Sequence, residues 1–108
     1  MSRCPLFPAL LLAAGLSGGA GFATDLSYNQ DIRPILVENC FGCHGADSAK
    51  RAADLRLDVR DAAIESGAIV PGDPDSSVML DRIFSDDPDE VMPPPHAKKT
   101  LSAEQKKL

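Results

Sequence analysis

The chain has 108 residues and a formal net charge of -5, with 16 acidic against 11 basic side chains. This length suffices for one small domain. The acidic balance argues against a nucleic acid partner, because phosphate binding needs a basic face.

Residues 1–23 have the features of a secretory signal peptide. Arg3 gives a charged start, an apolar run covers residues 6–16, and Gly21 and Ala23 are the small residues that a signal peptidase requires. The run is too short and too rich in glycine for the roughly 20 residues of a membrane span. We therefore expect cleavage after Ala23 and export to the periplasm or another extracytoplasmic space.

The mature domain predicted from this cleavage is 24–108, without a membrane span. Cys4 leaves with the signal peptide, so the only remaining cysteines are Cys40 and Cys43. The aromatic residues of this domain are Tyr28, Phe41 and Phe84. A core with so few large side chains would be marginal at this size without a cross-link or a cofactor.

A helix is predicted to begin near Asp31, capped by Asn29 or a neighbour, and to run to about Gly45. Pro34 supports a start close to Asp31, because proline is tolerated only in the first turn of a helix. Apolar residues recur along this segment at spacings of three and four, and they form one stripe: Ile32, Ile35, Leu36, Cys40 and Cys43.

The stripe ends in Cys40-Phe41-Gly42-Cys43-His44, which is C-x-x-C-H, the attachment sequence of a c-type haem. Residues three and four apart share one face of a helix, so Cys40, Cys43 and His44 are expected to point the same way. The two sulfurs can then form thioethers to the two vinyl groups of one porphyrin, while His44 ligates the iron. A covalently held porphyrin would also supply the apolar volume that the composition lacks.

Three other interpretations of this motif compete with haem attachment. A thioredoxin-like site needs a βαβ context, whereas the flanks here are predicted to be helical. A zinc site would add His96 as a fourth ligand, although the adjacent Cys43 and His44 fit one tetrahedral site poorly. The third interpretation is a plain disulfide between Cys40 and Cys43 in an exported domain.

The segment after the motif is predicted to contain little regular structure. Leu55, Leu57 and Val59 alternate with polar residues in an extended, strand-like stretch that is too short to require a sheet. Arg56 or Arg60 is a candidate partner for a haem propionate, although a solvated charge is the commoner role for an arginine.

Two helices are expected in the middle of the chain. The first is brief, covers residues 61–66 and ends at Gly67. The second begins after a turn, with Asp73 as its N-cap and Pro74 at its first position. Four of its apolar residues are expected to face the core: Val78, Met79, Ile83 and Phe84.

Val91-Met92-Pro93-Pro94-Pro95-His96 is predicted to be a stiff, extended segment, since each proline fixes its own φ and restricts the residue before it. Such a segment can present the Met92 sulfur on the haem face opposite His44, which would complete His/Met ligation. Met79 is a competing sulfur, but its helical spacing suggests core packing. His96 as the sixth ligand and an open sixth position are the two alternatives.

The last predicted element begins at Ser102, and Gln105 has the spacing of its capping-box partner. Only residues 103–108 follow, with Leu101 and Leu108 as the main apolar anchors. A helix this short is marginal alone. We therefore expect this closing helix to be incomplete and to continue beyond Leu108.

Taken together, these blocks resemble the planctomycete-type cytochrome c domain, from about Tyr28 to the end of the chain. The blocks are residues 29–36, the C-x-x-C-H motif, residues 55–58, residues 69–74, residues 92–95 and residues 101–105. The resemblance implies a mostly α fold, a small class I cytochrome c-like haem domain with extended loops. The chain departs from the family at its end, where the closing helix is truncated. It implies one covalent haem c on Cys40 and Cys43. It also implies His44 as the proximal iron ligand, and Met92 matches the position of the distal ligand.

The resulting hypothesis is an exported domain that transfers single electrons through a covalently bound haem. No nucleophile, carboxylate pair or open metal site is visible in the sequence, so the chain is not predicted to be an enzyme. The alternative is a haem-based ligand-binding, sensor or peroxidase-like domain with an open sixth position. The expected partners are redox proteins that present basic patches, and possible further domains of the same longer chain.

Overall fold

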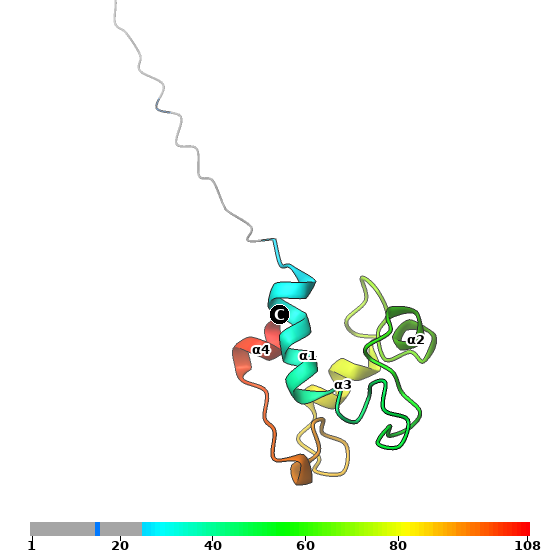
Figure 1. Cartoon of the computed structure of the whole chain (residues 1–108). Helices are drawn as coiled ribbons and strands as arrows, with labels where there is room; N and C mark the ends of the chain where they lie inside the picture. The colour runs from blue at the N-terminus through cyan, green and yellow to red at the C-terminus, as the bar shows by residue number, and fades with distance from the viewer. Residues whose placement is uncertain (1–14, 16–24) are drawn as a thin grey trace, which may run out of the picture.

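The computed structural model describes Gly15 and residues 25–108, so the predicted signal peptide lies outside the described residues except for Gly15. Within residues 25–108 the regular elements are all helical, with no strand. They are η1 (Tyr28–Ile32), α1 (Arg33–Asn39), α2 (Arg60–Glu65), α3 (Val78–Phe84), η2 (Pro95–Ala97) and α4 (Ala103–Lys107). Long loops join them (Figure 1). The predicted fold class, a small and mostly helical domain with extended loops, is confirmed.

The first helix is a π-helical turn, η1, that leads directly into α1. Ser27 caps η1, and the pairing is reciprocal, because its Oγ accepts from the Gln30 N–H at 3.4 Å while its own N–H donates to Asp31 at 2.7 Å. The prediction named Asn29 or a neighbour as the cap; Asn29 lies inside η1, and the cap is Ser27, two residues earlier. Pro34 is one of the first two residues of α1, where its missing N–H costs least.

Helix α1 ends at Asn39, six residues before the end at Gly45 that the sequence predicts. The N–H groups of Cys40 and Phe41 both donate to the carbonyl of Leu36, at 2.8 and 2.9 Å. Two donors on one acceptor break the regular i to i-4 ladder, so the chain leaves the helical path there. The C-x-x-C-H motif consequently occupies a turn, which the His44 N–H closes onto the Cys40 carbonyl at 2.9 Å.

The loop after the motif leads to α2 and to the central apolar cluster. This cluster consists of the buried residues Leu57, Ala63 and Ala68, with Cys40, Phe41, Leu55, Ile69 and Met79 packed against it. The stretch around Leu57 is extended without forming a strand, and the Leu57 N–H donates to the His44 carbonyl at 2.8 Å. The prediction of a brief helix before Gly67 is confirmed, with α2 one residue earlier than expected.

The third helix, α3, begins at Val78, not next to Pro74 as predicted. Asp73 instead accepts from the Ser76 N–H at 3.2 Å in a separate turn. The buried Ser77 hydroxyl accepts from the Val70 N–H and donates to the Asp73 carbonyl, both at 2.9 Å. These side-chain bonds compete with helical bonding and delay the start of α3. Within the helix Ile83 is buried as expected.

Two of the residues expected in the core of α3 are exposed. Val78 is 48% exposed and Phe84 is 56% exposed. Phe84 lies at the end of the helix, and the Lys106 ammonium lies 5.7 Å from the centre of its ring. The apolar spacing in this short helix therefore predicts more buried residues than the core actually covers.

The C-terminal segment returns past the first helix (Figure 1). The Lys99 ammonium donates to the Glu38 carbonyl, which joins this segment to α1. Leu101 is buried, and the predicted capping box between Ser102 and Gln105 is confirmed. In the part of the chain that the structure describes, no helix has the length and apolarity needed to cross a membrane.

Candidate functional site

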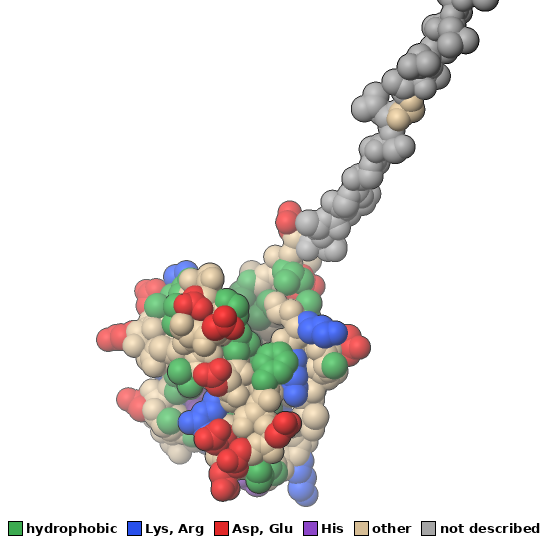
Figure 2. Space-filling model, turned by 180° about the vertical axis from the view of Figure 1, so that it is seen from behind, with side chains coloured by type: hydrophobic (Ala, Val, Ile, Leu, Met, Phe, Trp, Pro, Cys, Tyr) green, Lys and Arg blue, Asp and Glu red, His purple; other side chains and the backbone are tan. Residues whose placement is uncertain are grey.

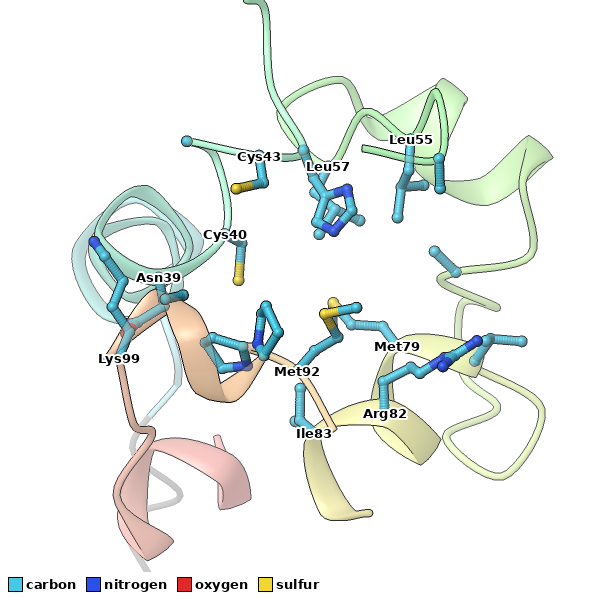
Figure 3. Close-up of a pocket in the computed structure, with 18 of the residues that line it drawn as sticks. Asn39, Cys40, Cys43, Leu55, Leu57, Met79, Arg82, Ile83, Met92 and Lys99 are labelled. Atoms are coloured by element: carbon cyan, nitrogen blue, oxygen red, sulfur yellow. The ribbon is translucent and has the colours of Figure 1, made fainter. Parts of the chain in front are cut away.

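A cavity of about 380 Å³ opens between the C-x-x-C-H turn, the loop around Leu55, helix α3 and the proline-rich segment after Met92. Its volume is within the range of about 300–1,000 Å³ typical of ligand and cofactor sites. Figure 3 shows Cys40 and Cys43 on one side of this cavity and Met79, Arg82 and Met92 on another. The cavity therefore gathers residues from almost the whole length of the domain.

Both cysteines of the motif line the cavity as free thiols. Cys43 is exposed and Cys40 is half-buried against the central cluster. Burial raises the pKa of the Cys40 thiol, and the nearby Lys99 ammonium opposes this effect. The two sulfurs are not joined in a disulfide, so both are available for thioether formation.

His44 lines the same cavity, with its orientation fixed by the backbone. Its Nδ1 lies 3.2 Å from the Ala52 carbonyl oxygen. A neutral imidazole that donates from Nδ1 keeps a lone pair on Nε2, and this arrangement is typical of metal-ligating histidines. The motif turn thus supplies two thiols and one imidazole whose Nδ1 faces a backbone carbonyl.

The loop that holds His44 is itself held by several hydrogen bonds. The Ala52 N–H donates to the Cys43 carbonyl at 2.7 Å, and the Arg51 Nε donates to the Gly45 carbonyl at 2.9 Å. Gly45 is required here, because a Cβ at this position would lie 2.2 Å from the Phe41 carbonyl oxygen. These contacts position the Ala52 carbonyl beside the imidazole.

Two methionines line the cavity on the side of α3 and the proline-rich segment. Both are half-buried. Met79 also packs against the central cluster, and its N–H donates to the Ala68 carbonyl at 3.0 Å. The Met92 N–H donates to the Arg82 carbonyl at 3.1 Å, so α3 fixes the start of the proline-rich segment. The thioether of Met92 belongs to a loop, whereas that of Met79 belongs to the packed helix.

The other candidates from the sequence lie outside the cavity. His96 is exposed in η2 and does not line it. Arg56 is paired with Asp58 at 2.7 Å, and this hydrogen-bonded partner lowers the pKa of the Asp58 carboxyl. Arg60 is exposed and also outside the cavity. Neither arginine is therefore placed to meet a group bound there.

Two cations that the sequence analysis did not select do line the cavity, namely Arg82 and Lys99. Arg82 lies three residues after Met79 and four after Val78, so helical spacing places it on their face of α3. That spacing is the signal by which Arg82 could have been found. Lys99 has no comparable signal, because it belongs to an irregular segment.

The rival interpretations of the motif lack structural support. A thioredoxin-like site needs strands beside the cysteines, and residues 25–108 contain none. Across the described part of the chain, no three His, Cys, Asp or Glu side chains gather in a way that could hold a metal ion. The four side chains proposed for zinc therefore do not meet.

A protein-family model described as Planctomycete cytochrome C matches residues 40–96, which is just over half of the chain. The chain belongs to this family. Searches among curated proteins and among solved structures gave no match. Cytochrome c domains carry electrons through a covalently bound haem, and they typically act as carriers rather than enzymes.

The residues of this cavity fit a covalent haem. Two free thiols with C-x-x-C spacing and an imidazole whose Nδ1 faces the Ala52 carbonyl line the same cavity. Apolar side chains from the central cluster and α3 form much of the rest, including Leu57 and Ile83. The donor set and the apolar lining are those that a haem c requires.

Proposed function

We propose that this chain is an exported electron-transfer domain with one haem c and His/Met axial ligation. Cys40 and Cys43 would hold the group by thioethers, with His44 as the proximal ligand and Met92 as the distal ligand. The observation that carries the proposal is that these four residues, from two distant segments, line a single cavity. Its partners would be other redox proteins.

The haem supplies a single-electron couple between ferrous and ferric iron. The protein contributes orientation, shielding and ligand strength. The Ala52 carbonyl would accept the Nδ1 proton of His44 and leave Nε2 free to ligate the iron. The thioether of Met92, a soft ligand, would favour the reduced state and raise the potential. Apolar residues such as Leu57 and Ile83 limit the access of water.

Met92 is preferred over Met79 as the distal ligand because Met79 already packs against the central apolar cluster, whereas Met92 does not. Met79 is held by a packed helix and already contacts the central cluster. Met92 lies at the start of the proline-rich segment, where its N–H is fixed to α3 and its side chain points into the cavity (Figure 3). The exposed position of His96 makes bis-histidine ligation the weaker alternative.

The test compares three single variants of the haem-loaded protein. Met92→Leu should abolish the sulfur-to-iron charge-transfer absorption, lower the reduction potential and speed the binding of cyanide, because leucine fills the space without a sulfur. Met79→Ala should keep the spectrum and lower the free energy of unfolding by about 1–2 kcal/mol, because Met79 is half-buried and only a fully buried methionine would cost about 2–5 kcal/mol. His96→Ala should leave both unchanged.

The opposite pattern would disprove the assignment. If Met79→Ala loses the charge-transfer absorption and Met92→Leu keeps it, then Met79 is the ligand. If wild-type protein lacks this absorption and binds cyanide at once, the sixth position is open, and the alternative of a ligand-binding domain holds.

Export is proposed from the sequence of residues 1–23. N-terminal sequencing of the haem-loaded protein should give a start at or close to Thr24. A haem-loaded protein that retains Met1 would contradict this.

A further inference from the structure

Arg82 shares the cavity-facing side of α3 with Val78 and Met79. In Figure 3 its side chain lies across the cavity from Cys40 and Cys43. Arg82 is exposed while it lines a largely apolar cavity, so its guanidinium can meet both solvent and an anionic group bound in the cavity.

Arg82 is bonded twice to the segment that presents Met92. Its backbone carbonyl accepts from the Met92 N–H at 3.1 Å. Its guanidinium donates from Nη1 to the Glu90 carbonyl at 3.4 Å. One residue therefore anchors both ends of the short stretch from Glu90 to Met92.

The guanidinium of Arg82 has no carboxylate partner among the described residues, whose two ion pairs are Arg51–Asp54 and Arg56–Asp58. Its hydrogen bond to the Glu90 carbonyl is long, so most of the five donors of this exposed guanidinium face solvent and can bind a ligand. The planar fork of an arginine is suited to bidentate binding of a carboxylate.

Lys99 is the other cation of the cavity, but it lies on the opposite side. Its ammonium donates to the Glu38 carbonyl on α1, and it is close enough to Cys40 to affect the pKa of that thiol. In a haem, the two vinyl groups that cysteines bind lie on one side of the ring and the two carboxylates on the other. A cation near Cys40 is therefore at the wrong side for the carboxylates, whereas Arg82 is across the cavity from the thiols.

We propose that Arg82 binds the carboxylate edge of the haem and, through Glu90 and Met92, positions the distal ligand segment. This inference rests on the proposed function. It assigns to Arg82 the role for which the sequence offered Arg56 or Arg60. One side chain would then link the anionic edge of the cofactor to the sulfur that ligates its iron.

The test uses haem-loaded Arg82→Gln, Arg82→Lys and the control Arg60→Gln, which removes an exposed arginine from outside the cavity. Arg82→Gln should lower the reduction potential, because a lost positive charge favours the more positive ferric state. It should also speed cyanide binding to the ferric protein by roughly tenfold, the equivalent of one charged hydrogen bond. Arg82→Lys should have the reduction potential of the wild type, because the positive charge is kept. Its cyanide binding should be slower than that of Arg82→Gln but faster than that of the wild type, since an ammonium cannot make the bidentate contact of a guanidinium. Arg60→Gln should change neither.

Equal potentials and cyanide rates in Arg82→Gln and Arg60→Gln would overturn the inference. So would an Arg82→Lys protein that folds, retains its spectrum and still shows the lowered potential, because a merely structural role would then explain the change. If Met92→Leu retains the charge-transfer absorption, the proposed axial ligand is wrong, and the potential of Arg82→Gln still decides whether this arginine meets the carboxylates.

Discussion

At the scale of single residues, the chemistry of His44 depends on a tight turn that begins at Ala52. Ala53 and Asp54 both have left-handed backbones, with φ of 54° and 51°. Consecutive non-glycine residues in this region cost free energy and persist only where the surroundings impose them. Here the hydrogen bonds of Ala52 to Cys43 and of Leu57 to His44 impose the turn. The result is a carbonyl held 3.2 Å from the imidazole Nδ1.

Ala53→Val tests this turn. A β-branched side chain is strongly disfavoured at positive φ, so we expect a loss of about 1–2 kcal/mol in the free energy of unfolding. The displaced Ala52 carbonyl should weaken the Nδ1 hydrogen bond, reduce the basicity of the ligand and raise the reduction potential.

Denaturant titration and potentiometry measure the two effects of Ala53→Val. Ala49→Val, in an exposed turn without positive φ, is the control and should change neither quantity. Unchanged potential in Ala53→Val would show that the carbonyl of Ala52 does not tune the imidazole.

At the scale of elements, hydrogen bonds at the ends of the helices decide where the site residues lie. The shared Leu36 carbonyl ends α1 before the motif, which turns the cysteines and His44 toward the cavity. The Ser77 hydroxyl joins the turn at Val70 to the start of α3. Because α3 carries Met79 and Arg82, this one hydroxyl helps to set the far wall of the cavity.

Ser77→Ala should therefore destabilise the protein. Ser77 is 5% exposed, and its hydroxyl bonds to the Val70 N–H and the Asp73 carbonyl, so loss of the hydroxyl leaves these groups without their partner. We expect a loss of about 1–3 kcal/mol in the free energy of unfolding. Ser76→Ala is the adjacent control, exposed and expected to change stability by less than about 0.5 kcal/mol. Equal denaturation midpoints for the two variants would refute this role for Ser77.

The sequence predicted what depends on residue type and spacing. The C-x-x-C-H motif, the capping box at Ser102 and the helical class follow from such patterns, and Met92 was selected because prolines stiffen its segment. The last residue of α1 was not predictable, because the Leu36 carbonyl that accepts from two N–H groups is seen only in the folded chain. The first residue of α3 was not predictable either, because it depends on the Ser77 hydroxyl, which competes with helical bonding. Arg82 was missed because a charge on a helix is usually solvated.

At the scale of the whole molecule, the domain has little core of its own. The buried apolar residues are Leu36, Leu57, Ala63, Ala68, Ile83 and Leu101, and the described residues include no large side chain with less than 2% exposure. Apolar side chains are instead interspersed with acidic ones over the face shown in Figure 2. The cavity lies beside this small core, because Leu57, Ala68 and Ile83 also line it.

The stability of the fold should consequently depend on the group that fills the cavity. The buried core is small and the cavity of about 380 Å³ is lined largely by apolar side chains, so a bound haem would supply much of the apolar contact of the domain. Small domains are stable by only about 5–15 kcal/mol in total. Loss of the haem should therefore remove most of the cooperative unfolding transition.

Cys40→Ala combined with Cys43→Ala tests this dependence in protein made with haem-maturation machinery. Acid and organic solvent should leave the pigment on wild-type protein and remove it from the double variant. The pigment-free double variant should then show a much lower or absent denaturation midpoint by circular dichroism. Ser48→Ala combined with Ser76→Ala, two exposed positions, controls for the number of substitutions and should match wild type. Free extraction from wild type would exclude thioether attachment, whereas a pigment-free variant as stable as the wild type would show that the chain builds a sufficient core without the haem.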